Sequence, residues 1–182
     1  DQRLHALGLS VEDISTVICS HMHWDHSGGL AFFEKKSSVQ QVITPKDDYA
    51  FGALQTLAPH QAAEDCPYFK DNYLMKNLNF ILADCDYSPF EGIDLILLKG
   101  HTPAVLGMVL HTESGTVIFP SDAIGSQANY QGRLPGIIYD SLGFQESLLK
   151  VRTLQQKNDA AILFPHDMAQ FRTWKTSPYF YC

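Results

Sequence analysis

A run of metal-binding side chains directly after a short apolar segment limits this chain more than any other feature. The run is His21-Met22-His23-Trp24-Asp25-His26, and it follows Thr16–Cys19, whose apolar residues predict a short buried strand. In extended backbone, side chains two positions apart point the same way, so His21 and His23 can share one ion. Imidazole and carboxylate are ligands that zinc prefers. Four such side chains in six residues predict a metal site; the alternative, a polar loop of solvated histidines, is the weaker interpretation.

The rest of the chain alternates segments typical of strands and helices, which predicts an α/β fold. A polar loop is expected at 20–27, followed after Gly28-Gly29 by a short helix up to residue 33. Further helices are expected at 3–8, from residue 45 with Asp47 and Asp48 near its N-terminus, and at 141–157, where Asp140 caps a helix with apolar residues at Leu148, Val151 and Leu154. Strands are expected at 40–44, 79–82, 93–98, 105–111, 116–120 and 160–164. Residues 59–73 show no clear period and predict an irregular insertion, and 122–139 predict a long loop. Because no linker or repeat interrupts the pattern, we expect one domain over residues 1–182.

Composition and charge exclude several classes of protein. The 182 residues are 45% hydrophobic and carry a formal net charge of −7, so the chain can bury a core but lacks the basic surface of nucleic-acid-binding proteins. No apolar run approaches the roughly 18 residues that a membrane helix needs. We therefore expect a small-molecule substrate and neither a nucleic acid nor a membrane as partner.

The pattern H-x-H-x-D-H followed by Gly28-Gly29 resembles the metallo-β-lactamase superfamily. This resemblance implies an αββα sandwich and three further ligands, each at the end of a later strand. The sequence offers one in each expected place: His101 after 93–98, Asp122 after 116–120, and His166 after 160–164. The complete set implied by the family is His21, His23, Asp25, His26, His101, Asp122 and His166.

The resemblance also implies how these residues act. Two divalent ions, by preference zinc, are expected to hold a bridging hydroxide that attacks a carbonyl group. One ion takes His21, His23 and His101, the other takes Asp25, His26 and His166, and Asp122 bridges the two. Asp25 and Asp122 are expected to orient the hydroxide and move its proton. His23 favours a hydrolytic site over the diiron branch of the superfamily, which usually has Glu at this position.

Within the superfamily the chain resembles the N-acyl homoserine lactonases, which are quorum-quenching enzymes, and the related pyridoxolactonases. The spacing from His26 to His101, the loop Leu134–Asp140 and the aromatic ending Tyr179-Phe180-Tyr181 carry this resemblance. It implies a hydrolase that opens a lactone or ester. The alternatives are a thioesterase of the glyoxalase II kind or a phosphodiesterase on the same scaffold, and an inactive or truncated homologue that binds only metal or a partner.

Two departures from the lactonase pattern concern the substrate and the sheet. The tyrosine that these lactonases place three residues after the bridging Asp is replaced by Gly125. Tyr130 or Tyr139 could contact the substrate instead, and Trp24 could form a wall of its pocket; packing roles are the alternative for all three. The chain also reaches His21 after one helix and one strand, so we expect part of the family's N-terminal half-sheet to be absent, and a shortened sheet favours a homodimer.

Cysteine usage and the first residues bear on the compartment. Cys19, Cys66, Cys85 and Cys182 form no C-x-x-C pair and are expected to be free thiols in a reducing compartment, although a bridge between Cys66 and Cys85 is an alternative. The charged start of the sequence does not resemble a signal peptide, which predicts a cytoplasmic protein.

Overall fold

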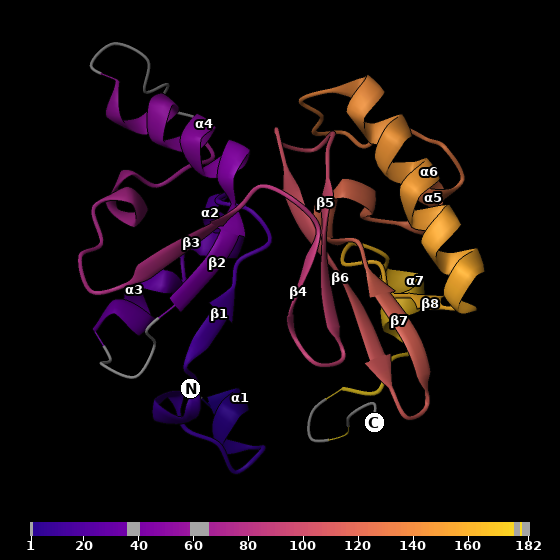
Figure 1. The fold of residues 1–182 in the computed structure, drawn as a ribbon, viewed down its shortest axis with the longest axis horizontal. Coiled ribbons are helices and arrows are strands. Elements are labelled where there is room, and N and C mark those ends of the chain that lie inside the picture. The colour runs from indigo at the N-terminus through magenta and orange to yellow at the C-terminus, as the bar shows by residue number, and fades with distance from the viewer. Residues whose placement is uncertain (1, 36–40, 59–65, 177–178, 180–182) are drawn as a thin grey trace. The chain divides into compact units, whose positions relative to one another are not determined.

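The computed structural model describes residues 2–35, 41–58, 66–176 and 179, and the chain divides into two compact units, residues 1–84 and 85–182 (Figure 1). Each unit contains its own sheet and its own hydrophobic core. The expectation of one domain over the whole chain stays a prediction. No helix among the described residues combines the length and the apolar character needed to cross a bilayer.

The first unit is built on a parallel sheet of three strands. Its order is β1 (Thr16–Ile18), β2 (Gln41–Pro45) and β3 (Asn79–Ala83). The central strand β2 is buried from Val42 to Pro45, as expected for a parallel strand covered on both faces. The helices of this unit are α1 (Gln2–His5), η1 (Val11–Asp13), α2 (Trp24–Ser27), α3 (Leu30–Glu34), α4 (Lys46–Leu57) and η2 (Lys70–Tyr73).

The second unit contains a sheet of five strands in the order of the sequence. They are β4 (Tyr87–Phe90), β5 (Ile93–Leu98), β6 (Val105–Thr112), β7 (Gly115–Phe119) and β8 (Ala161–Ile162). The first four are antiparallel, whereas β8 joins β7 in parallel. The shorter helices are η3 (Ser121–Ile124), α5 (Gln127–Tyr130) and α7 (Met168–Phe171).

The long helix α6 (Ser141–Asn158) covers this sheet and closes the core of the second unit (Figure 1). Its N-terminus is capped as the sequence predicts, because Asp140 accepts a hydrogen bond from the amide of Leu142. Phe144, Leu148 and Val151 recur at helical spacing and are buried against the strands. The core therefore fixes the sheet whose strand ends carry the later ligand candidates.

The structure corrects the expected elements in three places. Residues 24–27, expected as a polar loop, form α2, and the expected loop at 122–139 contains η3 and α5. Strand β4 was not predicted, because Pro89 interrupts an edge strand whose residues alternate between half-buried and exposed. Part of the expected insertion, residues 59–65, lies outside the described residues, and its end forms η2.

Candidate metal site

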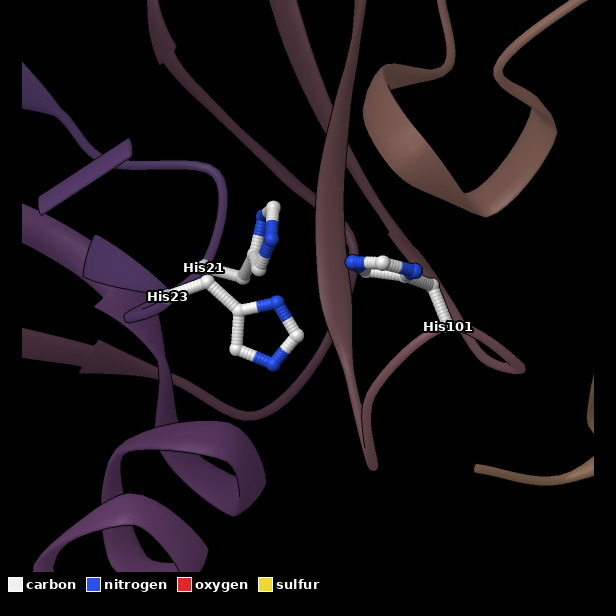
Figure 2. A group of neighbouring side chains, drawn as sticks. All are labelled: His21, His23 and His101. Atoms are coloured by element: carbon white, nitrogen blue, oxygen red, sulfur yellow. The ribbon is translucent and has the colours of Figure 1, made fainter. Parts of the chain in front are cut away.

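The first unit gathers three imidazole rings on the loop after β1. The ring centroids of His21 and His23 lie 4.7 Å apart, and those of His21 and His26 lie 4.0 Å apart. Figure 2 shows the rings of His21 and His23 side by side where the chain leaves the sheet. The two-residue spacing thus does bring both histidines to one side, as predicted. His26 and Asp25 are carried by α2, with 3.6 Å between Asp25 Oδ2 and His26 Nε2.

A buried carboxylate from another element holds this loop in place. Asp48, in the first turn of α4, is fully buried and accepts hydrogen bonds from the Met22 amide at 2.6 Å and the Tyr68 hydroxyl at 2.8 Å. The Tyr68 ring packs edge-on against His23, with centroids 4.9 Å apart. Burial, with the negative charge of Asp48 as a second cause, raises the pKa of Tyr68, so its hydroxyl stays a donor. Sequence reasoning assigned Asp48 only to the helix N-terminus.

A second set of hydrogen bonds fixes the backbone between the histidines. The Ser27 hydroxyl lies 3.0 Å from the carbonyl oxygens of both Met22 and His23, and Asn72 Nδ2 donates to Ser27 Oγ at 2.7 Å. All of these groups are buried, so water could not replace a hydrogen bond that is lost, and the group left behind would be unsatisfied. The loop that carries the donors is therefore held at several points before any ion binds.

The Ser20 hydroxyl contacts the same ring nitrogen, Nδ1, of two histidines. Its Oγ lies 3.1 Å from His21 Nδ1 and 3.3 Å from His26 Nδ1. A hydroxyl oxygen has two lone pairs, so it can accept an N–H from each ring. With the proton on Nδ1, each ring keeps the lone pair on Nε2 for a metal ion. Sequence reasoning missed Ser20; its position next to the first histidine was the available signal.

Cys19 lies beside these ligands but does not resemble one. Its thiol is buried, and its Sγ donates to the carbonyl of His21 at 3.0 Å. Burial raises the pKa of the Cys19 thiol to about 12, with a contribution from the charge of Asp48. The thiol packs in the hydrophobic core of the first unit, in agreement with the free thiol that the sequence predicts. Cys66 and Cys85 are free, so the alternative bridge between them is wrong.

The second unit brings its three candidates together from three strand ends. His101 follows β5, Asp122 lies in η3 after β7, and His166 follows β8. Asp122 Oδ2 lies 3.0 Å from His166 Nε2 and 3.7 Å from His101 Nε2. The carbonyl of Ile137 lies 3.3 Å from His101 Nδ1 and can hold the proton there, which leaves Nε2 of His101 as an acceptor (His101 is labelled in Figure 2).

A pocket of about 520 Å³ opens at these three residues. This volume is in the range of small-molecule sites. Its lining comes from the second unit alone: His101, Asp122, Gly125, Ser126, Ala128, Asn129, Arg133, Leu134, Pro135, Gly136, Ile137 and His166. The segment 133–137, part of the loop that the sequence singled out, supplies most of the apolar lining.

The three aromatic candidates for substrate contact differ in their surroundings. Trp24 is 55% exposed on α2, with its ring 6.5 Å from that of Phe69, and Tyr139 is 57% exposed. Tyr130 instead packs against the core, and its hydroxyl donates to Gln155 Oε1. The packing alternative is thus supported for Tyr130, and neither tyrosine lines the pocket at the ligand candidates.

Gly125 lies directly against one of the ligand candidates. Its carbonyl accepts a hydrogen bond from the His166 amide at 2.8 Å, and a Cβ at this position would lie 3.3 Å from His166 Cδ2. The absence of a side chain at residue 125 therefore leaves His166 room beside the backbone.

The donors of each unit suit a divalent metal ion. The first unit offers three imidazoles and a carboxylate, and the second offers two imidazoles and a carboxylate whose oxygen lies between their Nε2 atoms. Nitrogen and carboxylate donors without a thiolate match zinc and similar borderline ions. In the second unit, Oδ2 of Asp122 lies within 3.7 Å of the Nε2 atoms of both histidines.

Known proteins match this chain over nearly its full length. The profile of the "Metallo-beta-lactamase superfamily" matches residues 1–166. An N-acyl homoserine lactonase of a Bacillus species is 28% identical over 176 residues, covering 96% of this chain and 64% of that protein. The N-acyl homoserine lactonase AiiB of Agrobacterium fabrum is 30% identical, covering 93% and 63%.

A solved structure agrees in fold. A variant of Bacillus thuringiensis AiiA with N-decanoyl-L-homoserine at its active site superposes with a TM-score of 0.80 at 25% identity, covering 98% of this chain and 66% of that one. The chain thus spans less than two thirds of the length of the lactonases that it matches in sequence.

Proposed function

The chain belongs to the metallo-beta-lactamase superfamily and is similar to its N-acyl homoserine lactonases, and from this premise we propose that it is a metal-dependent hydrolase that opens lactones or esters. The observation that carries the proposal is the position of Asp122, whose Oδ2 lies between the Nε2 atoms of His101 and His166 beside a pocket of substrate size. The His21–His26 cluster supplies the remaining donors that the family requires.

We assign the ligands residue by residue. His21, His23 and His101 hold one ion, Asp25, His26 and His166 hold the other, and Asp122 contributes to both. Two zinc ions are the favoured occupants because the donors are imidazole and carboxylate. When bound, such ions polarise a carbonyl group and lower the pKa of a water molecule toward neutrality.

The protein's own groups prepare the site and guide the proton. Ser20 and the Ile137 carbonyl keep the ring protons of His21, His26 and His101 on Nδ1. Asp25, which is half-exposed, can take up a proton at its carboxylate and pass it to the leaving alkoxide or to solvent. Leu134 and Ile137 offer an apolar wall for the acyl part of the substrate. The free thiols Cys19, Cys66 and Cys85 favour a reducing compartment, and we place the reaction in the cytoplasm.

Metal content and hydrolysis test the proposal together. We expect elemental analysis of the 182-residue chain to give about two divalent ions. We expect hydrolysis of N-hexanoyl homoserine lactone to exceed that of a thioester or a phosphodiester. His23→Ala and Asp122→Ala should each lose metal and more than about 100-fold in kcat/KM, because each removes a ligand.

His111→Ala is the matched control. His111 pairs with Asp94 on the surface of β6 at 2.9 Å and contacts none of the ligand candidates of the second unit. It should keep the metal content and the activity of the unmodified chain. A chain that binds no metal, or that hydrolyses none of the three substrates when loaded, would contradict the proposal and favour an inactive homologue.

A further inference from the structure

The polar groups that line the pocket of the second unit are almost all engaged with one another. Ser126 Oγ donates to Asn129 Oδ1 at 2.8 Å, and Asn129 Nδ2 donates to the Arg133 carbonyl at 3.0 Å. His101 and His166 lie against the Ile137 carbonyl and Asp122. These polar groups are already used, either to hold the pocket together or as candidate metal ligands. A polar group on the substrate must therefore contact another residue of the lining.

Arg133 is the lining residue that remains for this contact. Its backbone is fixed at both ends, because its amide donates to the Ala128 carbonyl at 3.0 Å and its carbonyl accepts from Asn129. Gly132, at a φ of +105°, makes the turn that places Arg133 at the pocket. Among the described residues its guanidinium forms no ion pair with a carboxylate, although the chain as a whole has a net charge of −7.

The neighbours of Arg133 define the rest of the ligand. Leu134 and Ile137 follow it in the lining, and both expose much of their apolar side chains. A cation beside an apolar wall fits a molecule that carries an alkyl chain and an anionic group. None of the described residues that line this pocket is a tyrosine, and Gly125 offers no side chain, which leaves Arg133 as the pocket's distinctive polar contact.

We propose that Arg133 makes this protein selective for lactones or esters whose acyl part carries a carboxylate. The inference rests on the proposed hydrolase function and adds the substrate class. The guanidinium presents a planar set of donors that matches the two oxygens of a carboxylate. The chemistry at the metal ligands is unchanged by this contact, which acts on binding.

A matched pair of substrates tests the proposal. N-hexanoyl homoserine lactone and its N-adipoyl analogue have acyl chains of equal length and differ at the far end, where one carries a methyl group and the other a carboxylate. We expect the metal-loaded chain to show a kcat/KM about tenfold higher for the N-adipoyl lactone, and this preference should shrink as salt is raised. Arg133→Gln should raise KM for that substrate by about the same factor with little change in kcat, and it should change the kcat/KM of the neutral lactone much less.

Arg172→Gln is the control, since Arg172 is an exposed arginine of the second unit that does not line the pocket. It should change neither substrate. Equal kcat/KM values for the two lactones, or an equal loss for both in Arg133→Gln, would overturn the inference. If neither lactone is hydrolysed, the proposed function fails, and calorimetry with the two ring-opened acids decides the inference. Weaker binding of N-adipoyl-homoserine alone in Arg133→Gln supports it, and equal binding in both proteins overturns it.

Discussion

The two units position their candidate metal ligands in opposite ways. In the first unit the donors lie within six consecutive residues, and buried side chains from distant segments orient them: Asp48, Tyr68 and Asn72. In the second unit the donors come from strand ends up to 65 residues apart in the sequence, from His101 to His166, and the sheet brings these strand ends together. Ligands that are close in sequence need a network to fix the loop, whereas ligands at strand ends inherit their positions from the sheet.

The largest expected effect is the loss of the buried carboxylate that supports the first set. Asp48→Ala leaves the Met22 amide and the Tyr68 hydroxyl without their acceptor in a buried place. We expect a loss of about 3 kcal/mol in the free energy of unfolding, measured with urea, and a loss of metal. Asp47→Ala, at the exposed neighbouring position, should change the stability by less than about 0.5 kcal/mol. Equal effects of the two variants would break the contrast between the units.

A smaller effect is expected when the Ser20 hydroxyl, which contacts the rings of His21 and His26, is removed. Ser20→Ala removes the contact at Nδ1 of both His21 and His26, so both rings can adopt the wrong tautomer. We expect metal affinity, measured by competition with a chelator, to fall by about 10- to 100-fold while the fold persists. Ser20→Thr keeps the hydroxyl and should restore most of the affinity. An unchanged affinity in Ser20→Ala would mean that the loop alone orients the rings.

In the second unit, the position of a candidate ligand is tested by adding a side chain next to it. Gly125→Ala places a Cβ about 3.3 Å from His166 Cδ2, so the imidazole must shift by a few tenths of an ångström. We expect metal affinity to fall by a few-fold, at a cost of about 1 kcal/mol, with the sheet unaffected. Gly136→Ala is the control, because its added Cβ would meet no atom within 4 Å. A loss of overall stability in Gly125→Ala would show that the glycine serves the fold instead.

The smallest expected effect concerns a surface cluster away from the ligands. A hydrogen bond from Ser88, followed by one from His111, lowers the pKa of Asp94. Because the folded pKa lies below the unfolded one, the stabilisation is complete above the ordinary carboxyl range and is lost as the pH falls through the folded value. For a half-exposed group the effect is at most about 1 kcal/mol. Urea unfolding of Asp94→Asn between about pH 6 and pH 3 should show a weaker pH dependence than the unmodified chain.

The sequence predicted what depends on neighbouring residues. The spacing of His21 and His23, the capping of α6 by Asp140 and the helical repeat of Leu148 and Val151 are local patterns, and the structure confirms them. The family resemblance then directed attention to His101, Asp122 and His166, and the second unit does place these three together.

The sequence could not predict what depends on contacts between distant residues. Nothing near Asp48 reveals that it meets the backbone of Met22, 26 residues away, since acidic residues are common in the first turn of helices. The role of Ser20 depends on its contacts with the rings of His21 and His26, which only the structure shows. The sequence allowed Tyr130 to contact the substrate, whereas in the structure its hydroxyl bonds to Gln155. Strand β4 was hidden by Pro89, which weakens the local signal of a strand.

The grouping of the first set of donors also matters for the order of synthesis. The histidines of the loop and the side chains that hold it, from Ser20 to Asn72, all precede residue 84. A ribosome therefore synthesises this cluster together with its supports before it makes the second unit, and domains tend to fold in that order. The loop of the first donor set can therefore take its shape before His101, Asp122 and His166 are in place, so the two donor sets become ready at different times.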